Sequence, residues 1–174
     1  MRDLTTGTAA AKTHDEVSVA NLLEAEKAGW EALEGLVKQL TPEQAMIPGL
    51  HPGWSVKDLL AHVAGWLAEA GAALERSGSE TSTDGGVDVD ARNEVFVDAN
   101  RDQPLSLVLT EMRAARQRML LRLHGLSDVP AAAEASVRKA GPEHYAEHLP
   151  RLRKWVAELR SEPSGPERSP ESSP

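Results

Sequence analysis

Two histidines in the last third of the 174-residue chain, His144 and His148, lie four residues apart. On a helix this spacing is about 40° of rotation and roughly 6 Å of rise, so both imidazoles can reach one metal ion. At about 100° per residue, Trp155 and Leu159 fall on the same face as the pair. Two imidazoles that face an apolar core are costly unless something satisfies them. The pair therefore indicates a metal site, and the alternative is an incidental pair that binds nothing.

A third histidine, His62, lies at the edge of the apolar face of another expected helix, with Asp58 and Glu69 within about 40° of it. A site built from His62, His144 and His148 would supply three neutral nitrogen ligands. Three protein ligands leave a position open for water, as in catalytic zinc sites. Asp58 or Glu69 could orient the His62 ring or accept a proton. The alternatives are a helix-capping role for Asp58 and a backbone partner for His62.

The segment from His144 to His148 also matches H-x-x-E-H, the signature of inverted zinc proteases in which the glutamate is the general base. Glu147 would lie about 100° from His148 on a helix, and those proteases need a larger mixed fold. Glu147 is therefore only a candidate proton acceptor beside the metal. The chain contains no cysteine, which excludes thiolate ligands and disulfides. It also lacks the G-x-S-x-G, G-x-G-x-x-G and P-loop motifs.

Helical segments must position these side chains, because apolar residues recur at three- and four-residue steps along most of the chain. Ser55 and Asp58 form a capping box that should open the second segment. Gly141-Pro142 should open the last segment, since proline is tolerated in the first turn. The expected segments are 15–40, 55–76, 90–100 with 105–126, and 141–160. Amphipathic helices with short connections predict an all-α protein, a four-helix bundle.

The two ends of the chain and its charge narrow the possibilities further. Residues 1–14 lack periodicity and residues 161–174 hold four Pro and five Ser, so both are expected to be disordered around a single domain at 15–160. A net charge of -8 argues against binding nucleic acid. No apolar run is long enough to span a membrane, and Met1 to Ala11 lacks the apolar core of a secretory signal. We expect a cytoplasmic monomer or homodimer whose partner is a small molecule.

Three further side chains are candidates for contact with that molecule. Trp66 and Trp155 share helix faces with the histidines and could line a pocket. Arg116 lies inside the apolar stripe of 105–126, where it either extends its head to water or binds an anionic substrate. Met112 and Met119 would complete the pocket.

The string GWSVKDLLAHV, from Gly53 to Val63, resembles the W-S-x-x-D-x-L-x-H segment of the DinB-like superfamily. His144-Tyr145-x-x-His148 is similar to the closing segment of that superfamily. Its members include the N-terminal domain of mycothiol-dependent maleylpyruvate isomerase and the ClbS/DfsB proteins. The resemblance implies a four-helix bundle in which His62, His144 and His148 bind a divalent metal, zinc or nickel. It also implies an activity such as transfer or isomerisation with a thiol (mycothiol or bacillithiol), or hydrolysis of a reactive genotoxin.

Three functional hypotheses follow. The first is a metal-dependent enzyme that acts on a small electrophilic metabolite by hydrolysis or mycothiol-type transfer, in detoxification, self-resistance or secondary metabolism. The second is a protein of the same fold that sequesters a small molecule without turnover. The third is a bundle in which the metal only stabilises the fold.

Overall fold

A computed structural model describes residues 14–76, 88–126 and 129–161. Within these ranges the chain is helical and contains no strand. The elements, in chain order, are α1 (His14–Val37), α2 (Pro42–Ala45), α3 (Val56–Arg76), α4 (Val89–Ala99), α5 (Leu105–Gly125), α6 (Ala131–Arg138), the π-helical segment η1 (Lys139–Glu143) and α7 (His144–Ser161). None of these helices combines the length and apolar composition that a bilayer crossing requires.

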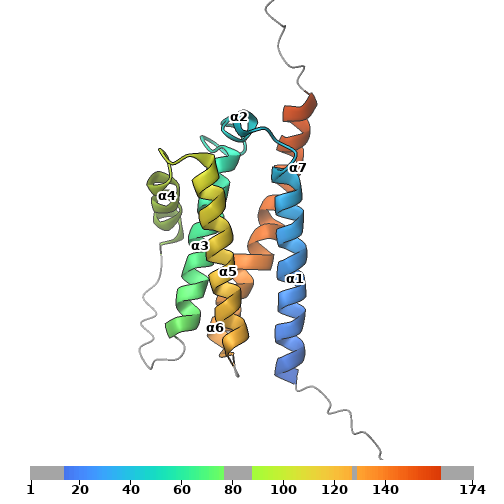
Figure 1. Cartoon of the computed structure of the whole chain (residues 1–174), viewed down its shortest axis with the longest axis vertical. Coiled ribbons are helices and arrows are strands. Elements are labelled where there is room, and N and C mark those ends of the chain that lie inside the picture. Colours follow the sequence, from blue (N-terminus) through green and yellow to red (C-terminus); the bar gives the residue numbers. More distant parts are fainter. Residues whose placement is uncertain (1–13, 77–87, 127–128, 162–174) are drawn as a thin grey trace, which may run out of the picture.

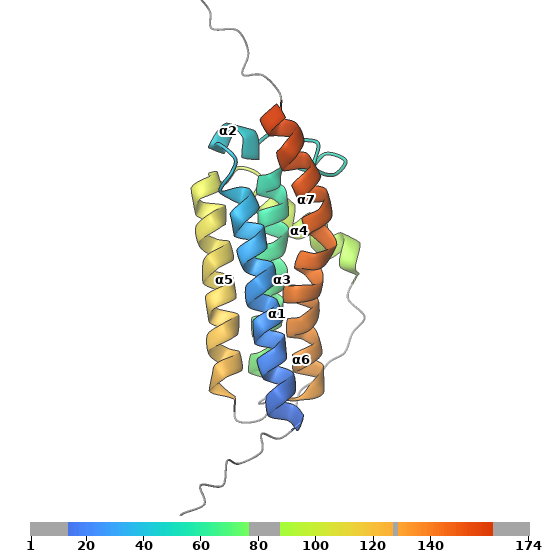
Figure 2. The ribbon, with the colours of Figure 1, turned by 90° about the vertical axis from the view of Figure 1, so that its right-hand side faces the viewer.

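Four long columns run side by side in the molecule: α1, α3, α5, and a fourth built from α6, η1 and α7 stacked end to end (Figures 1 and 2). The all-α, four-helix-bundle prediction is therefore confirmed. The short α2 lies at one end of the bundle, where Gln44 Nε2 donates to the carbonyl of Leu159 on α7 at 3.2 Å. Helix α4 lies outside the four columns, against α3 (Figure 1).

The apolar stripe expected on the second segment forms the centre of the core. Trp66, also expected in this stripe, is only partly buried and lines a cavity. The other members on α3 are all at most 3% exposed, and they are Leu59, Leu60, Val63, Leu67, Ala70 and Leu74. Helix α3 begins where the capping box places it. The Asp58 carboxylate accepts from the Ser55 backbone N–H at 2.8 Å, and the Asp58 N–H donates to Ser55 Oγ at 3.3 Å. Local sequence signals therefore set the start and the buried face of α3.

The last segment differs from the prediction. Helical structure begins at Ala131, ten residues before Gly141, and continues through η1 into α7. Pro142 lies inside η1 instead of opening a helix. Proline cannot donate to the preceding turn and its ring crowds the carbonyl four residues back, and the wider π turn accommodates both constraints. Pro150 also lies inside α7.

Smaller differences concern the helix ends. Helix α1 ends at Val37 and not at Leu40. His14 and Ser161, which the sequence predicts to be disordered, lie in helices. The rest of the expected disordered ends, 1–13 and 162–174, lies outside the described residues.

The buried lysine Lys57 links α3 to the end of α4 by hydrogen bonds. Its side chain leaves α3 and donates to the carbonyls of Asn100, Arg101 and Gln103, at 3.3, 2.6 and 3.1 Å. These carbonyls follow the end of α4, where the negative end of the helix dipole makes a cation favourable. Lys57 therefore fixes where α4 ends relative to α3.

A glycine allows α4 to approach α3 closely. A Cβ built on Gly65 would overlap the ring of Phe96 on α4, whereas one built on Gly35 of α1 would meet nothing within 4 Å. We expect Gly65→Ala to destabilise the fold by about 1–3 kcal/mol through overpacking. Gly35→Ala should instead stabilise it by up to about 1 kcal/mol through helix propensity. Urea unfolding of both variants measures the difference, and equal effects would contradict the close packing of α4.

Candidate functional site

Three histidines from distant parts of the chain meet inside the bundle. His62 comes from α3, and His144 and His148 come from the first turns of α7. The Nε2 atoms of His62 and His144 are 2.6 Å apart, and those of His148 and His62 are 3.3 Å apart. All three side chains are buried, and one ligand atom from each lies within 4.8 Å of the others. The structure thus brings together the three histidines that the sequence singled out, and we call them the histidine triad.

The segment η1 determines which face of α7 meets α3. A π turn inserts one extra residue into a helix, which rotates everything after it by about 100°. His144 directly follows η1, and His148 lies one turn later on the same side. The insertion therefore turns both imidazoles toward His62, which lies opposite them on α3.

The triad fits a divalent cation. Around a tetrahedral zinc ion with Zn–N distances of about 2.05 Å, ligand nitrogens lie roughly 3.3 Å apart. The His148–His62 separation equals this value and the His62–His144 separation is shorter. Within the described residues, the Nδ1 atoms of His62 and His144 are buried and make no hydrogen bond of standard geometry. Such buried ring nitrogens are costly in an apolar core, and the free energy of metal binding at Nε2 would offset that cost.

The protonation of the triad also suits a metal. Burial, reinforced by the neighbouring imidazoles, lowers the pKa of His62 to about 3, and the Asn93 side chain opposes this shift. Burial, together with His148, lowers the pKa of His144 to about 4, and the Ala140 carbonyl opposes it. Burial also lowers the pKa of His148, with Glu147 opposing. At neutral pH all three rings are therefore neutral, the form that binds a metal.

A cavity of about 700 Å³ opens over the triad. Trp66, Glu69 and Glu147, all proposed from the sequence, line it. Glu69 forms an ion pair with Arg92 of α4 at 3.2 Å. Trp66 Nε1 donates to Asn93 Oδ1 at 2.9 Å, which holds the indole toward α4. The remaining lining residues are His51, Pro52, Trp54, His62, Ala70, Ala73, Arg76, Val89, Asn93, Ser136, Lys139, Ala140, His144 and His148.

Other predicted site residues lie elsewhere. Asp58 does not line the cavity, and its carboxylate accepts from the backbone N–H and the hydroxyl of Ser55 at the start of α3. Trp155 does not line the cavity either, because its indole packs on Gly49 in the α2–α3 loop. The backbone at Gly49 has a φ of 139°, where a Cβ would lie 2.6 Å from the Trp155 ring. Met112 and Met119, expected in the pocket, are buried core residues of α5.

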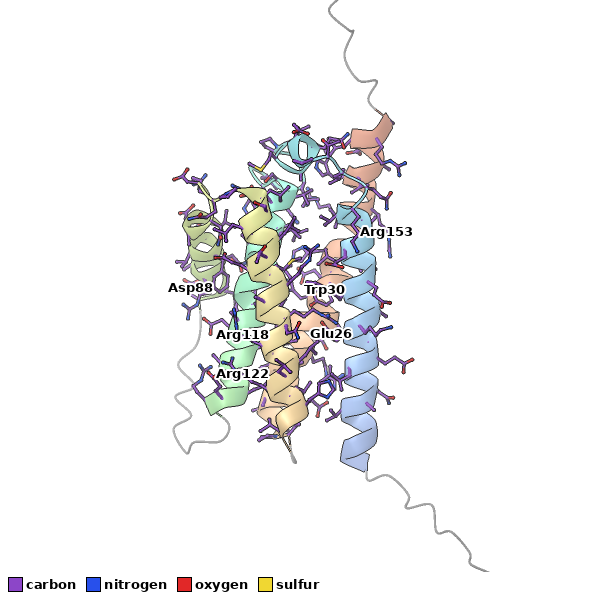
Figure 3. The ribbon with its side chains drawn as sticks, in the orientation of Figure 1. Glu26, Trp30, Asp88, Arg118, Arg122 and Arg153 are labelled. Carbon is purple, nitrogen blue, oxygen red and sulfur yellow. The ribbon has the colours of Figure 1, made fainter. Side chains whose placement is uncertain are left out.

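Arg116 belongs to a different cluster. Its Nε and Nη2 donate to the two carboxylate oxygens of Glu26, each at 2.7 Å, and its guanidinium lies 4.6 Å from the Trp30 ring centroid. Tyr145 Oη donates to Glu26 at 3.2 Å. Figure 3 shows Glu26 and Trp30 on α1. Arg116 therefore does not face the cavity as the anchor for an anionic substrate that the sequence suggested.

The sequence predicts no role for Glu26, Asn93 and His51. Glu26 is 1% exposed, and its only sequence signal was an acid inside the apolar stripe of α1. Asn93 and His51 line the cavity from α4 and from the Pro/Gly loop before α3. No local pattern distinguishes them, because their positions depend on how α4 and the loop pack on α3.

Comparison with known proteins agrees with the helical fold. The family model of the mycothiol maleylpyruvate isomerase N-terminal domain matches residues 27–159. Among solved structures, an uncharacterised protein from Escherichia coli UTI89 is similar, with a TM-score of 0.71 and 18% identity. That match covers 82% of this chain and 94% of the other, and it concerns the fold alone. No curated protein matches the chain. Because the family match covers most of the chain and all three histidines of the triad, the chain belongs to the mycothiol maleylpyruvate isomerase N-terminal domain family, within the DinB-like superfamily.

Proposed function

We propose that this protein is a metal-dependent enzyme that joins a small electrophilic metabolite to a mycothiol-type thiol or to water. The observation that carries the proposal is the convergence of three buried, neutral imidazoles at one wall of a cavity of about 700 Å³. Three protein ligands are the number found in catalytic zinc sites, whereas structural sites use four. Zinc or nickel suits nitrogen ligands of this kind.

A bound divalent metal would lower the pKa of a water or thiol in its open position, so that the nucleophile exists at neutral pH. The chain's own residues supply the remaining parts. Glu147 and Glu69 line the cavity and are the candidates for accepting the proton that the nucleophile loses. Trp54 and Trp66 give the cavity an aromatic wall for an apolar part of the substrate. The family description names mycothiol, which favours the thiol over water.

A second candidate function is sequestration of a toxic small molecule without turnover, as in self-resistance. The size of the cavity favours this alternative, because about 700 Å³ is ample for a drug-sized molecule. A sequestering protein would bind through the aromatic wall and would not need the triad. The two functions therefore differ in their dependence on the histidines.

The test uses zinc-loaded protein incubated with an epoxide, an activated ester and an unsaturated carboxylic acid, each with and without mycothiol. We expect mass spectrometry to show a thiol adduct that forms faster with wild type and with His124→Ala, an exposed-histidine control, than with His148→Ala. Hydrolysed product without adduct would identify water as the nucleophile. Stoichiometric binding of an unchanged electrophile that persists in His148→Ala would favour sequestration and overturn the enzyme.

A further inference from the structure

A fourth histidine, His51, lies beside the triad on the loop between α2 and α3. Its ring centroid is 5.6 Å from that of His148 and 5.7 Å from that of Trp54. The loop is fixed by backbone hydrogen bonds: the Trp54 N–H donates to the His51 carbonyl at 3.0 Å, and the Gly49 N–H donates to the Trp54 carbonyl at 2.9 Å. Gly53, at a φ of 79°, allows the tight turn between them. The backbone of the loop therefore holds His51 at the cavity wall.

Arg151, on α7, contacts the ring of His51. Its Nη1 lies 3.2 Å from His51 Nδ1. A guanidinium has donors and no acceptor, so Nδ1 must be the acceptor in this hydrogen bond. An imidazole whose Nδ1 lone pair is used in this way is neutral and carries its single ring proton on Nε2. Within the described part of the chain, Nε2 of His51 has no hydrogen-bond partner of its own.

We propose that Arg151 fixes His51 as a neutral Nε2–H donor, which hydrogen-bonds an oxygen of the small molecule held at the triad. The ligands that suit such a donor carry a carbonyl or carboxylate oxygen, because both accept a hydrogen bond without offering a proton. A ring fixed in this form donates and does not act as a general base, which leaves proton acceptance to the carboxylates of the cavity. The tautomer of His51 is independent of the proposed function, whereas the contact between His51 and the ligand rests on the proposed function.

The tautomer is tested by nitrogen-15 NMR of the metal-free protein. In wild type we expect His51 to show an unprotonated Nδ1 and a protonated Nε2, with the resonances assigned by their loss in His51→Gln. Arg151→Met should give a mixture of tautomers, whereas Arg153→Met, an exposed arginine on the same helix, should leave the wild-type pattern unchanged. A protonated Nδ1 in wild type, or an unchanged pattern in Arg151→Met, would overturn the proposal.

The ligand contact is tested with acetate as the probe and cobalt(II) as the metal, since visible spectra report changes at bound cobalt. Acetate should bind His51→Ala about tenfold more weakly than wild type, because one hydrogen bond to a carboxylate is lost. His51→Gln keeps an amide donor and should restore most of that affinity. Equal affinity in wild type and His51→Ala would refute the donor role. Failure of cobalt to bind at all would overturn the proposed function and the ligand contact together, and the NMR spectra would still decide the tautomer.

Discussion

Replacement of His62 by alanine is expected to abolish stoichiometric binding of zinc, with a loss of affinity of roughly 100-fold or more. Structural zinc sites with four ligands bind with about 10–16 kcal/mol, so one ligand contributes on the order of 3 kcal/mol. The three Nε2 atoms of the triad lie close enough to act on one ion, and burial keeps the rings neutral. Loss of any one of them leaves two protein ligands, too few for a tight zinc site.

Metal content after purification and a competition titration with a chelator measure this loss directly. Thermal unfolding gives a second readout, because a ligand at 100 times its dissociation constant stabilises a fold by about 2.7 kcal/mol. Zinc should therefore raise the melting temperature of wild type and of His124→Ala, whose histidine is exposed at the end of α5, and not that of His62→Ala. A wild-type protein that takes up no zinc, nickel or cobalt under these conditions would contradict the metal site.

Glu147→Gln removes a carboxylate of the cavity and leaves the three proposed metal ligands in place. Glu147 is exposed and lines the cavity next to His148 without belonging to the triad. Zinc affinity should therefore be nearly unchanged in this variant. If a bound metal only stabilised the bundle, zinc would raise the melting temperature and no thiol or electrophile would react in any variant.

The parts of the fold that local sequence determines were predictable. The start of α3 depends on two residues three positions apart, and its buried face depends on a helical repeat, both of which can be read without knowledge of the neighbours. The continuous column from α6 to α7 was not predictable in this way. Gly141-Pro142 is typical of a helix start. Whether the chain begins a helix there or continues one through a π turn depends on packing, because η1 contacts α1, α3 and α6.

In the site, too, the features set by local sequence were predictable and those set by tertiary packing were not. His144 and His148 were recognisable because their spacing and their apolar face are both local, and His62 lies on a helix with a clear stripe. The partner of Arg116 was not recognisable, since Glu26 lies 90 residues away and only the packing of α1 against α5 and α7 brings the two together. An arginine and a glutamate inside two apolar stripes are each ambiguous alone, and their pairing is a tertiary property.

The second large expected effect is a loss of fold stability when the Arg116–Glu26 ion pair is broken. Arg116→Met should destabilise the fold by about 3–5 kcal/mol, because it leaves a buried carboxylate without its cation. Glu26 is 1% exposed, and after the substitution the Tyr145 hydroxyl, at 3.2 Å, would be its one remaining donor among the residues that the structure describes. Trp30 would also lose the guanidinium that lies over its ring. Urea unfolding of the metal-free protein measures the change.

Two further variants distinguish an unpaired charge from simple loss of contact. Glu31→Gln breaks the exposed Lys27–Glu31 pair on the same helix, and it should cost less than about 1 kcal/mol. The double variant Glu26→Leu with Arg116→Met removes both charges and should recover most of the stability lost in Arg116→Met, since no unpaired charge then remains in the core. If the double variant is no more stable than Arg116→Met, the ion pair is not what makes Arg116 important, and packing against Trp30 would account for the loss.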